Sequence, residues 1–170
     1  MKVYRNNIND ALLKSRMKKM CNILKIPRVA DLCYEHIRGS VKVFLENLIM
    51  RIIHVTAFFQ KHVVTLNVIY TATERYDILP SAKIKSCFQK PLSSPCYVFP
   101  KYPFERFIRE IFQDEGSKLQ FDKHSLPCIQ MISEHYLRHI LMNARLVMLQ
   151  AKRKTLYPSD LMVVENNYGR

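Results

Sequence analysis

Two long apolar-periodic segments constrain what this chain can fold into more than any other feature. In residues 29–59, and again in residues 125–150, apolar side chains recur every three to four positions. The first segment predicts a helix of about 45 Å at 1.5 Å per residue, which exceeds the width of a small domain. Because the flanking helical segments are short, each long helix needs a partner of similar shape. The two halves of the chain are most simply each other's partner.

Short helices are expected on both sides of the first long helix. Residues 8–21 are amphipathic, and this helix must end near Pro27, because proline disfavours helical geometry in the residue before it. After the loop at 60–65, Thr65 is suited to cap a last short helix that runs to Glu74. The expected buried stripe of the long helix contains Leu32, Ile37, Val41, Phe44, Leu45, Leu48, Ile49, Ile52, Val55 and Phe59.

The second half repeats this plan about ninety residues later. Pro103 suits the first turn of a short helix, and Gly116 ends it. Ser125 can cap the second long helix, and Pro158 begins a final short one. The expected buried stripe of the second long helix contains Ile129, Ile132, Tyr136, Ile140, Ala144 and Val147.

The periodicity predicts an all-α protein, because alternation typical of strands is almost absent and only three glycines occur. We divide the chain into a first helical domain, a connector with room for a short extra helix, and a second helical domain. Their boundaries are 1–79, 80–102 and 103–170.

The charge is strongly positive, with 27 Lys and Arg against 14 Asp and Glu, or +13 at neutral pH. Such an excess indicates a polyanionic partner. Nucleic acid is the leading candidate, and an anionic membrane surface is the alternative. The most apolar window, residues 41–60, contains several charged and polar side chains and is unsuited to hydrocarbon. That window is therefore not expected to span a membrane. The sequence also lacks a one-sided basic amphipathic helix for binding at a membrane surface, so we expect no membrane partner.

The sequence gives little indication of metal binding or catalysis. The five cysteines are an odd number without a Cys-x-x-Cys pair, and we expect buried or incidental thiols in a reducing compartment. His135 and His139 have the spacing of a two-histidine metal site but no third ligand nearby. We expect no metal, no cofactor and no enzymatic activity.

Short motifs in the two halves resemble two different core histones. The first half resembles histone four in three segments: YRNNI at 4–8, YEHIRGSVKVFLENLI at 34–49 and NVIY at 67–70. Histone three is resembled by PFERFIREIFQD at 103–114, LQF at 119–121, EHYL at 134–137 and AKRKTLYPSD at 151–160. The chain as a whole resembles a fused core histone doublet of the kind carried by large DNA viruses.

This resemblance implies two histone folds in tandem that form an intramolecular handshake pseudo-heterodimer. It also implies a protein that binds and wraps double-stranded DNA without sequence specificity, as the central part of a nucleosome-like particle. Such a protein would be found in the virion and in the host nucleus or viral factory. A histone-fold interaction module, resembling a transcription-factor subunit and binding DNA weakly or not at all, is the alternative.

Residues of this chain can be matched to those in the DNA-binding loops of the histones that it resembles. Arg28 matches the arginine that enters the minor groove, and Thr155 matches the threonine that supports it. In the second matched pair of loops, Gln120 stands where these histones have the groove arginine, and Val63 stands where they have the threonine. The resemblance and the basic positions together give as DNA-binding candidates Arg5, Lys18, Lys19, Arg28, Lys61, His62, Lys101, Arg106, Arg109, Lys118, Lys152, Arg153, Lys154 and Thr155.

The resemblance also implies contacts with other proteins. An ion pair between Arg153 and Asp160 is expected in the second half, whereas Lys61 and Asn67 cannot form its counterpart. Gly39 either allows close helix approach or is simply tolerated. Self-association with a second copy is expected through Leu146, Leu149, Arg153 and Asp160, and contact with histone two-A/two-B-like dimers or doublets through Phe58, Phe59 and Tyr70.

Overall fold

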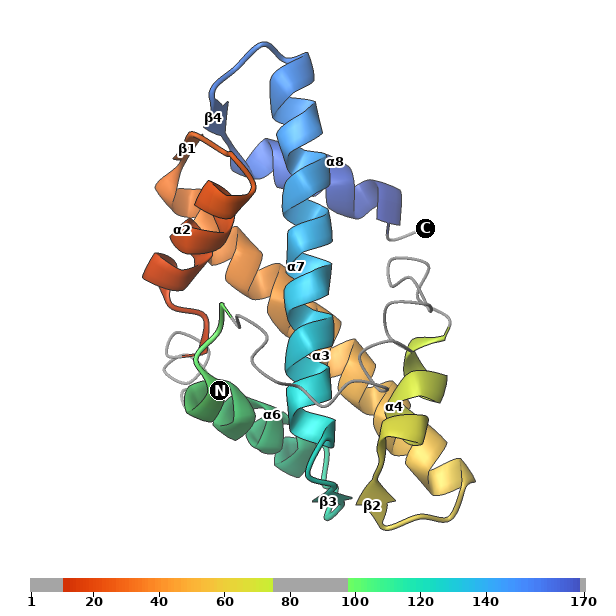
Figure 1. Ribbon diagram of the computed structural model, residues 1–170. Helices are drawn as coiled ribbons and strands as arrows, with labels where there is room; N and C mark the ends of the chain where they lie inside the picture. Colours follow the sequence, from red (N-terminus) through yellow and green to blue (C-terminus); the bar gives the residue numbers. More distant parts are fainter. Residues whose placement is uncertain (1–10, 75–97, 169–170) are drawn as a thin grey trace.

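The computed structural model describes residues 11–74 and 98–168 (Figure 1). Arg5, the first residues of the expected initial helix and most of the connector lie outside these ranges. The first half contains α2 (Lys14–Ile23), β1 (Arg28–Val29), α3 (Asp31–Phe58), β2 (Val63–Val64) and α4 (Leu66–Thr73). The second half contains α6 (Lys101–Asp114), β3 (Gln120–Phe121), α7 (Ser125–Gln150), β4 (Thr155–Leu156) and α8 (Pro158–Tyr168).

The two long helices cross at the centre of the molecule (Figure 1). Near the crossing, the rings of Phe44 and Tyr136 stack with centroids 3.9 Å apart. The mostly helical class and the repeated short, long, short order are confirmed, although α6 begins two residues before Pro103. The apolar stripes of both long helices therefore belong to one core that contains residues from both halves of the chain.

Two parallel strand pairs, which the periodicity did not predict, also join the halves. β1 pairs with β4, and β2 pairs with β3. Each strand has only two residues, too few for alternation to appear in the sequence. Figure 1 shows the two pairs at opposite ends of the molecule.

Three expectations about the ends of α3 and α7 are wrong. Leu32 is 72% exposed and Phe59 is 47% exposed, because both lie at the ends of α3, away from the crossing. Ser125 does not cap α7 but is its first residue, and its hydroxyl donates to the carbonyl of Val64 (2.5 Å) in the other half. Its side chain therefore joins the two halves.

Gly39 is simply tolerated in α3. Apart from Gly39, its two chain neighbours and the adjoining backbone of α3, no atom of the described residues lies within 4 Å of where a Cβ would stand at this position. Of the two interpretations of this glycine, close approach of a second helix is therefore the wrong one.

The expectation that the Thr65 side chain caps α4 is also wrong. Thr65 occupies the N-cap position, but its side chain makes no capping hydrogen bond. Its hydroxyl oxygen is buried without a partner among the described residues. The short α4 is instead held by the burial of Val68 and Ile69.

Polar contacts tie the ends of the helices to the crossing. Glu165 on α8 pairs with the Nε2 atom of His36 on α3 (3.0 Å), and the hydroxyl of Ser40 also donates to Glu165. On α7, the buried carboxylate of Glu134 accepts the backbone N–H groups of Val98 and Phe99, both at 2.9 Å. The segment that leads into α6 is therefore fixed on the surface of α7.

Burial raises the pKa of Glu134, although its N–H donors act in the opposite direction. Stability contributed by its protonated form is present below the unfolded pKa and is lost as pH rises through the higher folded pKa. Relative to Glu134→Gln, the wild-type protein should therefore lose stability as pH rises above about 4, where an ordinary glutamate ionises. Urea unfolding over a series of pH values measures the difference.

Two matched variants sharpen this prediction. Glu134→Ala should cost about 2 kcal/mol at low pH, because two buried N–H groups lose their acceptor, and this cost should shrink as pH rises and the wild-type carboxyl ionises. Asp114→Asn, at an exposed carboxylate on α6, should leave the pH profile unchanged. Parallel pH profiles for the wild type and Glu134→Gln would contradict the role of burial.

The described cysteines agree with the expectation of buried thiols. Cys21, Cys33 and Cys128 are buried and carry no disulfide. Burial raises the pKa of both Cys21 and Cys33 to about 11. These two thiols stay neutral at physiological pH and pack as small apolar groups.

Candidate nucleic-acid interface

The two ends of the molecule each combine one loop from the first half with one from the second. The arginine end consists of residues 24–30 and 151–157, joined by β1 and β4. The glutamine end consists of residues 59–65 and 115–124, joined by β2 and β3. Since these loops carry many of the predicted DNA-binding residues, each end is a candidate contact for DNA.

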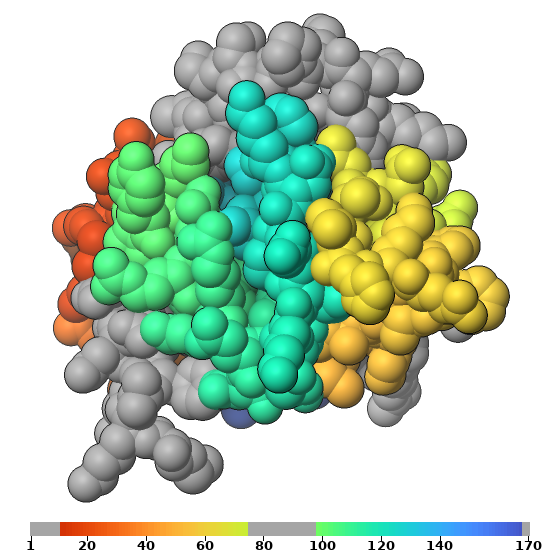
Figure 2. Space-filling view, turned by 90° about the horizontal axis from the view of Figure 1, so that it is seen from below, coloured from red at the N-terminus to blue at the C-terminus, as the bar shows by residue number. Residues whose placement is uncertain are grey.

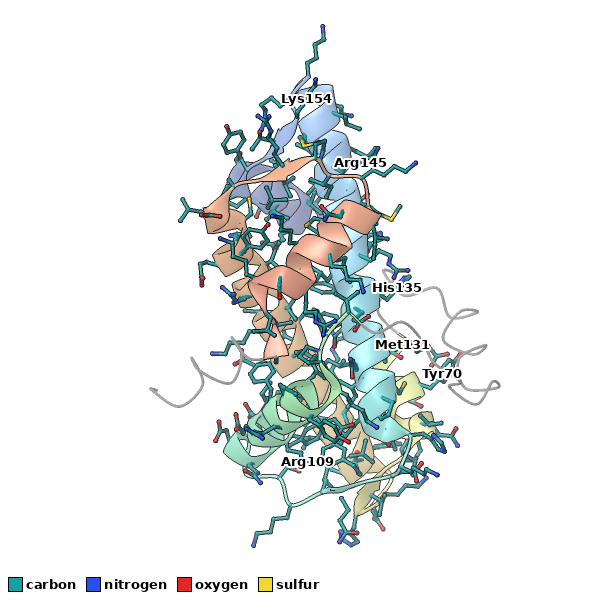
Figure 3. The ribbon with its side chains drawn as sticks, turned by 60° about the vertical axis from the view of Figure 1, so that its left-hand side comes forward. Tyr70, Arg109, Met131, His135, Arg145 and Lys154 are labelled. Carbon is teal, nitrogen blue, oxygen red and sulfur yellow. The ribbon has the colours of Figure 1, made fainter. Side chains whose placement is uncertain are left out.

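At the arginine end, Arg28 lies directly opposite Thr155 in the parallel register. The Ala30 N–H donates to the Leu156 carbonyl (3.0 Å), and the Cys33 thiol donates to the same oxygen (3.2 Å). The structure therefore brings Arg28 and Thr155 together, as the matched motifs predict. Arg28 is exposed, and Figure 3 shows Lys154 extending from this end of the molecule.

The Arg153–Asp160 ion pair is present and fixes the same loop. The Nη2 and Nη1 atoms of Arg153 donate to the two carboxylate oxygens of Asp160 at 2.7 and 3.2 Å. The Tyr157 N–H also donates to Asp160 (3.0 Å), and hydrogen bonding to Asp160 raises the pKa of Arg153. Because its guanidinium is engaged in this way, Arg153 positions the loop.

Asp160 is expected at a self-association surface from the sequence, but the structure buries it. Its side chain is 2% exposed, because Arg153 and Tyr157 surround the carboxylate within the chain. Leu146 and Leu149, expected at the same surface, are 55% and 48% exposed. The hydrophobic members of the predicted surface are accessible, and the acidic member is not.

At the glutamine end, Gln120 lies opposite Val63. The Gln120 N–H donates to the His62 carbonyl (3.0 Å), so the backbone pairing resembles that of the other end. Two hollows of about 640 and 570 Å³ flank residues 117–119. Lys61, His62 and Lys118 line the larger one together with Glu115, and Arg109, Lys118 and Gln120 line the smaller one.

Figure 2 views the glutamine end from below. The teal residues around β3 and the start of α7 lie between the green α6 and the yellow residues near α4. Elements from both halves therefore form this surface side by side. Figure 3 shows Arg109 on α6 near this end, opposite to Lys154.

Charge separates the two ends clearly. The loops of the arginine end contain five lysines and arginines and no acidic residue. The loops of the glutamine end contain three lysines, two acidic residues and two histidines. A polyanion is therefore attracted more strongly to the arginine end at neutral pH.

The remaining basic candidates lie on the two short helices that precede these loops. Lys18 and Lys19 are exposed on α2. Lys101, Arg106 and Arg109 are exposed on α6, and the Lys101 ammonium lies 6.0 Å from the Tyr102 ring centroid. These positions extend the basic surface beyond the loops.

Exposed apolar residues mark two further surfaces. Phe58 is 81% exposed and packs edge to face with Phe59, while Tyr70 is half-buried. In addition to Leu146 and Leu149, Met142 on α7 and Met162 and Val163 on α8 are each about half exposed, and the sequence did not single them out. Helical spacing could have found Met142, because it precedes Leu146 by one turn.

The described residues also bear on metal binding and on membrane insertion. Residues 11–74 and 98–168 contain no group of three or more His, Cys, Asp or Glu side chains arranged to hold a metal ion. Within the same ranges, no helix combines the length and apolar character needed to cross a bilayer.

Comparison with known proteins agrees with this arrangement. Residues 88–164 match the family described as the core histone domain of histones two-A, two-B, three and four. The structure is similar to that of the histone from Methanopyrus kandleri, with a TM-score of 0.70 and 11% sequence identity. That similarity covers 92% of this chain and 95% of the other, so it includes both helical halves. The chain therefore has the histone fold, and its second half matches the core histone domain in sequence.

Proposed function

We propose that this protein binds and wraps double-stranded DNA without sequence specificity, as the central part of a nucleosome-like particle. The observation that carries the proposal is the register of Arg28 with Thr155 in loops that contain five cations, of which, among the described residues, only Arg153 is paired, with Asp160. Phosphate attraction and counterion release supply such binding without reading bases. The histone fold and the net charge of +13 support it.

The arginine end is the main DNA contact in this proposal. Arg28 enters the minor groove, and Thr155 supports it from the neighbouring strand. Lys152 and Lys154 contact the flanking phosphates. The Arg153–Asp160 ion pair keeps these lysines in place, because it fixes the loop between α7 and α8.

The glutamine end holds DNA more weakly. Gln120 carries no charge to place in the groove, so Lys61, His62 and Lys118 contact phosphate alone. Glu115 and Asp122 reduce the local positive potential. Unequal ends would allow DNA to leave the particle from one side first.

Assembly follows from the exposed apolar residues. We propose that the two halves act as a handshake pair within one chain, with a histone four-like half and a histone three-like half. A second copy packs on Leu146 and Leu149, extended by Met142 and Met162. Histone two-A/two-B-like dimers or doublets pack on Phe58, Phe59 and Tyr70. Such a particle suits a viral genome in the virion, the host nucleus or a viral factory.

Nuclease digestion tests wrapping. DNA reconstituted with the full chain and a two-A/two-B-type partner should give discrete protected lengths, with shorter protection by the protein alone. Full digestion under both conditions at moderate salt would contradict the proposal and favour a histone-fold interaction module. Digestion to a continuous range of lengths would show binding without wrapping.

A further inference from the structure

The four loops that follow α2, α3, α6 and α7 begin with the same backbone turn. Its residue with positive φ is Lys25 (57°), Gln60 (51°), Gly116 (69°) and Lys152 (53°), respectively. In the first loop, the Lys25 N–H donates to the Asn22 carbonyl and the Ile26 N–H donates to the Cys21 carbonyl, both at 3.0 Å. This is the hydrogen-bond pattern of a helix that ends in a left-handed residue.

Glycine adopts this left-handed conformation freely, whereas lysine and glutamine are strained in it. Three of the four turns therefore carry a residue that their backbone disfavours. Only Gly116, at the glutamine end, is the residue that such a turn prefers. Such strain is a reason to ask what the side chain does, and positive charge distinguishes the two lysines from Gln60.

The strained lysines both belong to the arginine end. Lys25 lies three residues before Arg28, and Lys152 lies three residues before Thr155. Because β1 and β4 pair in register, the two lysines occupy equivalent positions in neighbouring loops. Both are exposed, and among the described residues no acidic side chain pairs with either.

We infer that Lys25, which sequence reasoning overlooked, binds a backbone phosphate of duplex DNA, as the counterpart in the Arg28 loop of Lys152 in the Thr155 loop. This inference rests on the proposed function and adds a specific residue to it. A lysine at this turn adds an exposed cation three residues from Arg28, and among the described residues no acidic side chain pairs with it. A glycine at position 25 would provide no side-chain charge to contact the phosphate.

A competing explanation is purely local. A lysine near the C-terminus of a helix interacts favourably with the negative end of the helix dipole. In that case Lys25 would stabilise α2 and have no part in DNA binding. Measurements of stability and of DNA affinity on the same variants separate the two explanations.

The test uses the full chain, a fluorescent duplex and thermal unfolding. Lys25→Gly should raise the melting temperature by about 2 °C, because it relieves the left-handed strain. It should also lower DNA affinity about fivefold at 0.1 M salt and make the log–log salt slope shallower by about one. Lys25→Gln should lower affinity equally without the rise in melting temperature, and Lys25→Arg should retain affinity.

Gln60→Gly is the matched control at the glutamine end. It relieves the same strain without removing a charge, so the melting temperature should rise while DNA affinity stays constant. Unchanged affinity and salt slope in Lys25→Gly and Lys25→Gln would overturn the inference. If Arg28→Ala still weakens binding in that case, the proposed function stands; if the wild-type protein does not bind DNA, the proposed function fails as well.

Discussion

Replacing Asp160 with alanine is expected to lower the free energy of unfolding by about 2 kcal/mol. The carboxylate is almost fully buried and accepts hydrogen bonds from Arg153 and from the Tyr157 backbone N–H. Removing it leaves these donors without their acceptor and leaves a void beneath the loop between α7 and α8. Urea unfolding monitored by circular dichroism measures the loss.

Two variants control for the change of residue. Asp160→Asn keeps the shape of the side chain and should cost less than Asp160→Ala. Asn67 on α4 is the position matched to Asp160 in the first half, and it is exposed. Asn67→Ala should change stability by less than about 0.5 kcal/mol. Equal small effects at Asp160 and Asn67 would show that the ion pair does not hold the loop.

Removing charge from the arginine end is expected to have the largest effect on DNA binding. Replacing Arg28, Lys152 and Lys154 with glutamine removes three cations from loops that contain no acidic residue. The salt slope should become shallower by about three, and affinity at 0.1 M salt should fall about 100-fold. Fluorescence anisotropy with a labelled duplex across a salt series measures both quantities.

The matched variant removes the same number of charges from the glutamine end. Replacing Lys61, Lys118 and Lys123 with glutamine should lower affinity by about tenfold or less, because Glu115 and Asp122 already weaken attraction there. Equal losses from the two triple variants would contradict the asymmetry between the ends. A larger loss at the glutamine end would reverse the assignment.

Helical periodicity was sufficient to predict the main elements of this fold. The long stripes on α3 and α7 needed partners, and the short, long, short order of each half followed from proline, glycine and apolar spacing. The positions that periodicity misjudged, such as Leu32 and Phe59, lie at helix ends where the partner helix no longer covers the stripe. Exposure there depends on the crossing geometry, which spacing alone does not determine.

The loops were predicted less completely because their chemistry depends on contacts between the halves. Matched motifs were enough to pair Arg28 with Thr155 and Arg153 with Asp160. The same reasoning placed Asp160 on an outer surface, although its ion pair buries it. Lys25 was missed because its left-handed backbone is visible only in the structure.

Binding of the wild-type chain to two unrelated duplexes over a range of salt concentrations tests the central claim most directly. If about eight to ten of the DNA-binding candidates contact phosphate, the log–log salt slope should be about −8, with the same affinity for both sequences. That result would establish attraction to phosphate without base readout. No measurable binding at 0.1 M salt, a slope near zero, or a strong preference for one sequence would contradict the account.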